Sequence, residues 1–202
     1  MQLPEIIARR RMVRSFDGSA PSHETLAKWA ELALLAPTAG NSAGVRLVVI
    51  EGGAVADYFA AATDQAWRST AQRSAGLQRA GAVVAAFSCP SLYTARYGES
   101  DKATSGLSDV NAWTVPYWHT DAAMAVMQLL LLIEHDEWSA CFWGNFRNEP
   151  QVRDLCELSD EWQLFGTVLI GNDDGNDRQS ASLRRDVSSR AQRVTWLSRA
   201  AD

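Results

Sequence analysis

The spacing of hydrophobic residues along this chain switches repeatedly between a helical period and a strand-like one. Apolar positions recur three and four residues apart in several segments, which predicts amphipathic or buried helices. These helices are expected at residues 3–11, 22–37, 54–75, 117–135 and 149–158. Runs of β-branched and aromatic residues predict strands at residues 45–51, 81–88, 138–143 and 162–171. The chain is therefore expected to mix helices and strands in one fold.

The helix expected at residues 117–135 is the longest apolar one and is predicted to lie at the centre of the fold. Its most hydrophobic part, Ala122 to Ile133, is interrupted by Gln128. That run is far shorter than the roughly 20 apolar residues that a membrane span needs. We therefore interpret this segment as a buried helix and expect no membrane partner.

Two stretches of the chain lack a clear period. Residues 89–118 are about thirty residues rich in Tyr, Ser, Gly, Thr and charged types, and a connector of that length is usually a functional lid or a mobile segment. Residues 172–202 form a polar, arginine-rich tail with Val194, Trp196 and Leu197 near its end. Such apolar residues without a periodic element of their own suit an arm that docks on another subunit, and a frayed terminus is the alternative.

The composition is that of one globular domain covering residues 1–202, with 47% hydrophobic and 21% charged residues. A formal net charge of −5 gives no overall attraction to nucleic acid or anionic membrane, so a local arginine cluster has to be interpreted as a site. The three cysteines are odd in number and form no CxxC pair, which favours a reducing compartment. The N-terminus carries no apolar signal segment, so a cytoplasmic protein is expected.

Two short motifs flank the helix predicted at residues 22–37. They are Arg10-Arg11-Met12-Val13-Arg14-Ser15-Phe16 and Ala36-Pro37-Thr38-Ala39-Gly40-Asn41-Ser42. Arginine presents a fixed fork of donors that matches phosphate oxygens, and the Asn41 amide both donates and accepts, as the edge of a heterocycle requires. The helix dipole alone also explains arginines at a helix end, but Arg14 lies beyond it, where alternation directs Met12 and Arg14 to one side. The motifs predict a phosphorylated, flat cofactor.

Several other motifs lack the structural context that their usual function requires. Gly40-Asn41-Ser42-Ala43-Gly44 matches G-x-S-x-G, but a nucleophile elbow follows a strand and opens a helix, and here that order is reversed. The acidic run at residues 172–177 is similar to a calcium loop, yet Leu183 or Arg184 occupies the place of the bidentate glutamate. The histidines and cysteines lack zinc spacing, and a lone His119 is more often a satisfied interior or rim residue than a ligand. From the calcium-loop and zinc comparisons we expect no metal. Neither G-x-G-x-x-G nor Walker A is present, so we expect any phosphate to be held by side chains.

Phe142-Trp143-Gly144-Asn145-Phe146 is the most informative sequence in the second half of the chain. A glycine at the end of a strand lets backbone amides approach a ligand closely, without a dedicated side chain. Trp113, Trp118 and Trp143 flank predicted loops and are expected to border a ring-binding pocket.

These motifs, in this order and with Asp121 near the start of the long helix, resemble the nitroreductase family of flavoproteins over nearly the whole chain. The first motif is similar to the family's R-R-S-x-R-x-F and the second to its A-P-S-x-x-N-S-Q-P. The resemblance implies an α+β fold with a central, mainly antiparallel β-sheet surrounded by helices. It also implies an intertwined homodimer with FMN at the interface and a C-terminal extension over the partner.

The resemblance assigns roles to particular residues. The phosphate, ribityl chain and pyrimidine edge of FMN would be contacted by Arg10, Arg11 and Arg14, with Met12 in the place of the family's usual serine. Asn41 would bond the O2/N3 side of the ring. Phe142, Trp143, Gly144 and Asn145 would pass along the other side, with a backbone N–H of Gly144 or Asn145 near the flavin N5 atom.

Two further segments receive roles in the same way. The C-terminal arginines Arg184, Arg185 and Arg190 are candidates for reaching the phosphate, and Arg185 is the residue we expect to do so. The segment 89–118 would cover the acceptor with the side chains of Tyr93, Arg96, Tyr97, Trp113 and Trp118.

The implied activity is an FMN-dependent oxidoreductase. NADH or NADPH would give a hydride to N5, and a small acceptor such as a nitroaromatic or a quinone would then take the electrons in a ping-pong cycle; a deazaflavin donor is also open. Met12 and Ala43-Gly44-Val45, where the family has Gln-Pro and a hydrophobic residue, depart from the family pattern. Dehalogenation, desaturation, flavin fragmentation or flavin binding without turnover are the alternatives.

Overall fold

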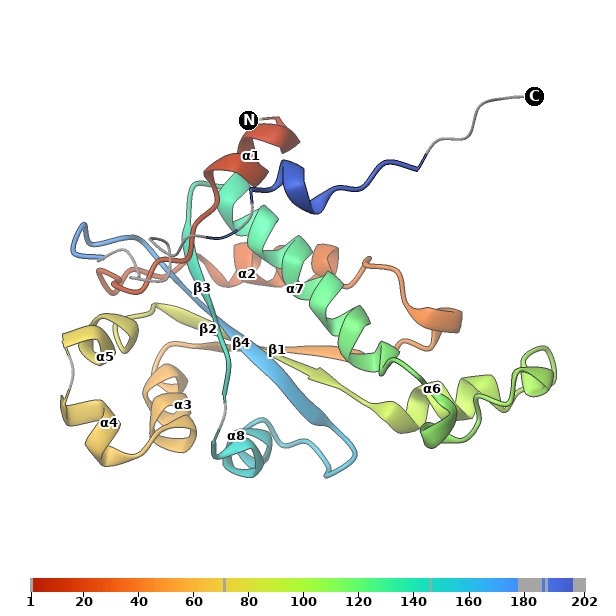
Figure 1. The fold of residues 1–202 in the computed structure, drawn as a ribbon. Coiled ribbons are helices and arrows are strands. Elements are labelled where there is room, and N and C mark those ends of the chain that lie inside the picture. The colour runs from red at the N-terminus through yellow and green to blue at the C-terminus, as the bar shows by residue number, and fades with distance from the viewer. Residues whose placement is uncertain (1, 71, 146, 178–186, 188, 198–202) are drawn as a thin grey trace.

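The computed structural model describes residues 2–70, 72–145, 147–177, 187 and 189–197. Within these residues, four strands form one sheet in the order β1-β2-β4-β3, and every pair of neighbours is antiparallel. The strands are β1 (Val45–Glu51), β2 (Ala82–Ser88), β3 (Ser139–Trp143) and β4 (Gln163–Gly171). The antiparallel α+β architecture expected from the sequence is confirmed (Figure 1).

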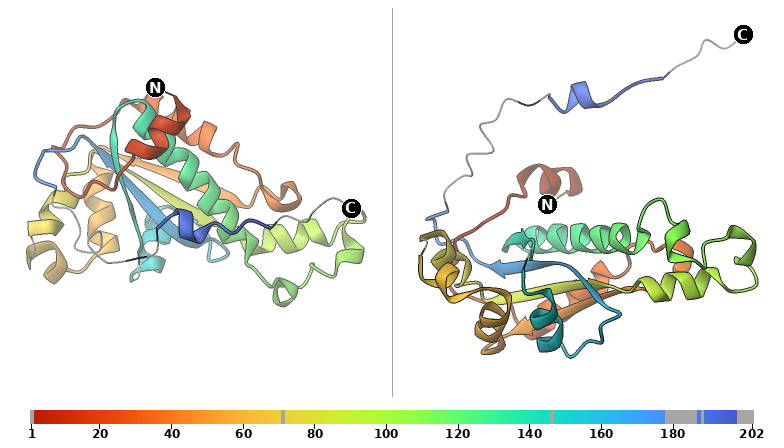
Figure 2. Two further views of the ribbon diagram at one scale, coloured as in Figure 1. Left: turned by 45° about the horizontal axis from the view of Figure 1, so that its top comes forward. Right: turned by 60° about the horizontal axis from the view of Figure 1, so that its bottom comes forward.

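Helices cover both faces of this sheet. They are α1 (Leu3–Arg9), α2 (His23–Ala33), α3 (Ala54–Ala62), α4 (Gln65–Thr70), α5 (Gln72–Leu77), α6 (Pro90–Tyr97), α7 (Tyr117–His135) and α8 (Glu149–Leu155). Single 3₁₀ turns occur at η1 (Ala39–Asn41), η2 (Ala103–Ser105), η3 (Val110–Ala112) and η5 (Ala191–Arg193). The long helix α7 crosses one face together with α2, whereas α3 and α8 lie on the other, as the two views of Figure 2 also show.

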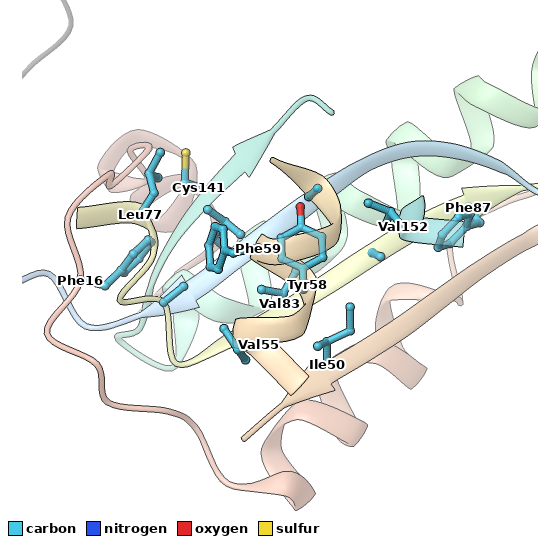
Figure 3. Packing of buried hydrophobic residues seen from close by; sticks show 14 of the residues in the cluster. Phe16, Ile50, Val55, Tyr58, Phe59, Leu77, Val83, Phe87, Cys141 and Val152 are labelled. Carbon is cyan, nitrogen blue, oxygen red and sulfur yellow. The ribbon is translucent and has the colours of Figure 1, made fainter. Parts of the chain in front are cut away.

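The central strand β2 explains why its sequence reads as one uninterrupted apolar run. Successive side chains of a strand point to opposite faces, and both faces of β2 are covered. Val83, Ala85 and Phe87 pack into the cluster beneath α3 and α8, where Figure 3 shows Val83 and Phe87 beside Tyr58 and Val152. The alternate residues of β2 pack with Leu26, Trp29, Leu129 and Ile133 of α2 and α7. The sheet therefore separates two hydrophobic clusters, one on each of its faces.

The prediction of one continuous helix at residues 54–75 is wrong, because the segment is divided into α3, α4 and α5. Thr63 is extended, with φ −136° and ψ 155°, and ends α3. The next residue, Asp64, accepts a hydrogen bond from the backbone N–H of Trp67 at 2.6 Å, which caps the start of α4. A side chain that hydrogen-bonds the backbone in this way ends one helix and starts the next. The spacing of apolar residues along the sequence does not reveal such a hydrogen bond.

The segment 89–118, interpreted from the sequence as a long connector that is a lid or a mobile segment, contains a helix of its own. Pro90 opens helix α6, at a position that tolerates proline because the first helical N–H has no partner in any case. Two 3₁₀ turns follow before α7 begins, and Trp113 Nε1 donates to the carbonyl of Leu107 at 2.8 Å. In Figure 1 this green segment projects beyond the start of α7. Its role as a lid stays a prediction.

The C-terminal tail contains apolar side chains that nothing in the described part of the chain covers. Val194, Trp196 and Leu197 are 55%, 89% and 88% exposed. Of the three arginines that are candidates for a phosphate contact, Arg184 and Arg185 lie outside the described residues, and Arg190 lies at the start of η5. Among the helices that the structure does describe, none is both long and apolar enough to cross a membrane.

Candidate functional site

The arginine segment lies along the edge of the sheet, against β3. Met12 forms a parallel bridge with Ala140, and the backbone N–H of Val13 donates to the Ala140 carbonyl at 2.9 Å. Met12 Sδ accepts the backbone N–H of Phe142 at 3.2 Å. The methionine that replaces the family's serine therefore satisfies a donor on an edge strand, which has no further strand to pair with. This contact brings the arginine segment beside the strand that leads into Phe142–Asn145.

The three arginines of this segment differ in how their charge is compensated. Arg11 forms ion pairs with Asp173 and Asp177, at 3.2 Å to the latter. Neither Arg10 nor Arg14 has a carboxylate partner among the described residues. Arg14 donates to the carbonyl of Met12 at 3.1 Å, and Arg10 Nε is buried without any partner in the same part of the chain. Arg10 and Arg14 are thus the positive charges available for an anion.

A second set of ion pairs ties the N-terminal segment to the end of β4. Asp174 pairs with Arg79 and accepts from the Ser15 hydroxyl at 2.9 Å. The backbone N–H of Asn176 donates to the same carboxylate at 2.8 Å. Carboxylates of the acidic run that is similar to a calcium loop therefore form ion pairs with arginines. The described residues contain no cluster suited to a metal ion.

This network predicts a pH dependence of stability. Hydrogen bonds from Asn176 first, then Ser15 and Arg79, lower the pKa of Asp174 to about 2 from its usual 3.8. Because the folded pKa is the lower one, Asp174 contributes stability above pH 3.8, and that contribution is lost as the pH falls toward 2. Melting temperatures between pH 5 and pH 2 should fall less steeply for Asp174→Asn than for the wild type; parallel curves would contradict this role.

The segment after β3 presents backbone and side-chain donors. Among the described residues, the backbone N–H groups of Gly144 and Asn145 have no hydrogen-bond partner. Asn145 Oδ1 accepts from the hydroxyls of Tyr58 at 3.2 Å and Thr167 at 3.1 Å. Its Nδ2 atom is buried and unpartnered within the described chain. The Trp143 ring points away, into the core with Trp67, at 5.3 Å between ring centres.

The Asn41 turn is a strained and well-supported loop. Gly40, Asn41 and Ala43 all have positive φ, of 62°, 55° and 51°. The backbone N–H of Ala39 donates to Asp121 Oδ2 at 2.8 Å, which fastens the turn to the start of α7. Gly44 is needed because a Cβ atom there would collide with the Tyr93 ring. The departure from the family's Gln-Pro therefore accompanies a close contact with α6.

The residues expected to form the lid meet in one aromatic cluster against this turn. Tyr93 is fully buried and donates to Asp121 Oδ2 at 2.8 Å. The pKa of Tyr93 is raised by burial and by that carboxylate, so its hydroxyl stays protonated. Trp113 packs edge-on against Tyr97 at 4.9 Å, and Trp118 is 8% exposed. Tyr93 and Trp118 support the turn from inside, and neither offers a free surface to a substrate.

Arg96 supports the same turn from the outer side. Its Nε donates to the Gly40 carbonyl at 2.9 Å, and its two terminal nitrogens bond both oxygens of Asp101 at 2.7 Å. The pKa of Asp101 is lowered by this guanidinium. Arg96 is consequently neutralised, and it acts here as a brace for the turn.

Sequence reasoning passed over two residues beside these segments, Tyr58 and Thr167, because no local pattern links them to Asn145. His119, interpreted from the sequence as a satisfied interior or rim residue, is half-buried, and its Nδ1 is hydrogen-bonded to the Ser88 hydroxyl at 3.0 Å. Burial lowers the pKa of His119, so it is neutral at physiological pH. Its ring lies 6.2 Å from that of Phe165, which stacks on Phe142 at 5.6 Å.

The two halves of the expected cofactor site lie far apart in a single chain. At the end of α7, Arg9 pairs with Glu134 at 2.6 Å, which fixes the arginine segment there. The Asn41 turn is fastened to Asp121, near the start of the same helix. Glu134 follows Asp121 by thirteen positions of the helix, or about 20 Å at 1.5 Å per residue. Figures 1 and 2 show η1 and α1 at opposite ends of α7.

Comparison with known proteins agrees with this architecture. The nitroreductase from Lactococcus lactis in complex with nicotinic acid superposes with a TM-score of 0.77, at 14% identity, over 98% of this chain and 100% of that one. A nitroreductase from Exiguobacterium sibiricum in complex with FMN gives 0.71, at 19% identity, over 98% of both chains. The FMN- and NADPH-dependent nitroreductase from Sphigopyxis sp. strain HMH gives 0.69, at 19% identity, over 98% of this chain and 100% of that one.

At the level of sequence, no curated protein matches the chain significantly. The model of the Nitroreductase family, in contrast, matches residues 7–172, which include the arginine segment, the Asn41 turn and Phe142–Asn145. By this match, which covers most of its length, the chain belongs to the nitroreductase family.

Proposed function

We propose that this chain is an FMN-dependent oxidoreductase that transfers a hydride from NADH or NADPH to a small electron-poor acceptor, such as a nitroaromatic or a quinone. The observation that carries the proposal is a pair of buried donors without partners in the described chain, Arg10 Nε and Asn145 Nδ2, on two segments joined along β3. A buried donor left unpaired costs about 1–3 kcal/mol, so such groups are expected to meet an acceptor on a ligand. Both belong to the set that the family resemblance assigns to the cofactor.

The residues present suit a flavin mononucleotide. Arg10 and Arg14 would hold the phosphate and the pyrimidine edge of the ring, because their charges are uncompensated in the described chain and guanidinium groups bond anionic oxygens strongly. Asn41 would bond the polar edge of the ring. The backbone N–H of Gly144 or Asn145, neither of which has a partner in the described chain, would donate at N5. When bound, FMN supplies a two-electron carrier that accepts a hydride at N5 and passes it on.

The site is proposed to be shared between two copies of the chain. The arginine segment and Asn41 were both assigned to the pyrimidine edge of one ring, yet about 20 Å of α7 separates them in one chain. In a two-fold dimer, one part of each chain can meet a different part of the other chain, and symmetry forms that contact twice. In such a dimer each flavin would lie between the arginine segment of one copy and the Asn41 turn of the other.

An apolar surface on α2 and α7 supports this assembly. Exposed hydrophobic side chains gather there from the end of α2 and the outer side of α7: Leu32, Leu34, Leu35, Met124 and Met127. A groove of about 280 Å³ runs among Leu32, Leu35, Gln128, Leu131 and Leu132. A monomer rarely leaves a large contiguous apolar patch in water, so a second copy is the proposed occupant. The exposed Trp196 and Leu197 would add the C-terminal extension to that contact.

The protein's part in the reaction is to bind, orient and shield. Arginine near the pyrimidine edge stabilises the negative charge that the reduced ring carries. The backbone N–H groups after β3 provide fixed dipoles that need no reorganisation during the transfer. Tyr97 and Trp113, the partly exposed members of the aromatic cluster beside the Asn41 turn, would limit the size of the acceptor.

Two measurements test the proposal. Purified protein should be yellow, or become yellow with added FMN, and should oxidise NADH or NADPH when a nitroaromatic or quinone is present. Colourless protein that takes up no added FMN would contradict the cofactor assignment. Bound flavin that neither nicotinamide reduces would point instead to dehalogenation, desaturation, flavin fragmentation or a binding role without turnover.

A further inference from the structure

A buried trio of polar side chains joins three distant parts of the chain behind the expected flavin ring. Tyr58 comes from α3, Thr167 from β4 and Asn145 from the segment after β3. The Tyr58 and Thr167 hydroxyl oxygens are 2.8 Å apart, and both residues are fully buried. Each hydroxyl also lies within 3.2 Å of Asn145 Oδ1. Figure 3 shows Tyr58 wedged beside Phe59 and above Val83, so its hydroxyl has little freedom to move.

In the structure, the Tyr58 and Thr167 hydroxyls both face the Asn145 amide oxygen as donors. Two hydroxyl protons are available, and the acceptors are Asn145 Oδ1, the Trp143 carbonyl 3.2 Å from Thr167, and the hydroxyl oxygens themselves. Both protons therefore find acceptors within the trio and Trp143. Burial raises the pKa of Tyr58 to about 12, so its proton is present throughout the physiological range. The amide oxygen of Asn145 is held inward.

As a consequence, the Asn145 amino group points away from the Tyr58 and Thr167 hydroxyls. Nδ2 is buried and has no partner among the described residues, although every other side-chain polar atom of the trio has one. A donor fixed in this way costs the protein about 1–3 kcal/mol unless a ligand provides an acceptor. On the edge around N5, an oxidised flavin ring has a carbonyl oxygen that can accept it, and that oxygen remains an acceptor in the reduced ring.

We propose that the Asn145 side-chain amide donates a hydrogen bond to the flavin ring, and that Tyr58 and Thr167 are positioning residues that aim it and thereby raise the reduction potential of the bound flavin. This inference rests on the proposed function, and it adds a side-chain contact to the backbone contacts described above. A donor to the ring stabilises the reduced, more negative form more than the oxidised form. Removing the donor should therefore make the flavin harder to reduce.

The test is the midpoint potential of FMN bound to the full-length protein, measured by spectroscopic reduction against a reference dye. Asn145→Ala should shift the equilibrium toward oxidised flavin about tenfold, which is about 30 mV for a two-electron couple. Asn145→Asp has the same shape but replaces the donor by a carboxylate oxygen, so it should shift the potential further in the same direction. Thr167→Val and Tyr58→Phe should give smaller shifts, also downward.

Two control variants distinguish a positioning role from a packing role. Thr167→Ser restores the hydroxyl and should restore the wild-type potential, whereas Thr25→Val removes a hydroxyl on α2, far from the trio, and should leave the potential unchanged. If Asn145→Ala and Asn145→Asp bind FMN with an unshifted potential, the inference is overturned. If the wild type takes up no FMN at all, the proposed function fails first, before any variant is compared.

Discussion

Replacing both Arg10 and Arg14 by alanine is expected to weaken FMN binding about 10²- to 10⁴-fold. Each guanidinium is proposed to make a charge-assisted contact with the phosphate or the pyrimidine edge of FMN, worth about 1.5–3 kcal/mol, and every 1.4 kcal/mol is about tenfold in affinity. Their charges are free for this role because neither has a carboxylate partner in the described chain. Titration of apo-protein into FMN, followed by flavin fluorescence, measures the change.

The neighbouring arginines provide matched controls. Arg9 is paired with Glu134 and Arg11 with Asp173 and Asp177, so each already has an anion of its own. Arg9→Ala should leave FMN affinity near that of the wild type, and Arg11→Ala should lower it less than either Arg10→Ala or Arg14→Ala. A double Arg10/Arg14 variant with wild-type affinity would show that the phosphate lies elsewhere.

Asp121→Ala is expected to lower the free energy of unfolding by about 2–5 kcal/mol. The carboxylate is 1% exposed and accepts from the Ala39 backbone N–H and the Tyr93 hydroxyl, both at 2.8 Å. Alanine leaves both donors buried without an acceptor, at about 1–3 kcal/mol each. Because the same carboxylate fastens the Asn41 turn to α7, FMN affinity should fall as well. Urea unfolding, followed by circular dichroism, gives the stability change.

Two variants separate the parts of this effect. Tyr93→Phe removes one donor and keeps the ring packing, so its loss of stability should be smaller than that of Asp121→Ala. Asp121→Asn keeps the shape and an acceptor oxygen, and it should retain more stability than the alanine variant. An Asp121→Ala protein as stable as the wild type would mean that the turn is not held from α7.

The elements of the fold were largely predictable because their signals are local. The apolar run of β2 and the long apolar helix α7 follow directly from residue periodicity, and both formed at the expected positions. The failures were also local in origin. Asp64 breaks a helical period by capping, and Pro90 starts a helix where the polar composition indicated a loop. Capping and N-terminal proline act through single residues, and a period averaged over a window does not detect them.

The candidate site was only partly predictable from the sequence. Its segments were found through motifs, but the partners of individual residues depend on the tertiary fold. Arg11 meets Asp173, 162 positions away, and Tyr58 meets Asn145, 87 positions away. No local pattern reveals that one arginine is neutralised and its neighbour is not. Nor does the sequence reveal that α7 separates the arginine segment from the Asn41 turn.

The central claim, a flavin site shared between two copies, is tested most directly by mixing damaged subunits. One copy carries Arg10→Ala with Arg14→Ala, and the other carries Asn41→Glu, which places a negative charge against the polar edge of the ring. Each variant alone should purify nearly colourless. Co-expression with two different tags isolates the mixed dimer, whose FMN content is read from the visible spectrum.

In a shared site, the mixed dimer has one site carrying all the substitutions and one carrying none, because the two halves come from different chains. It should therefore recover about half of the wild-type flavin content. If the whole site belonged to one chain, every site in the mixed dimer would be damaged. A mixed dimer as colourless as its parents would contradict the shared site.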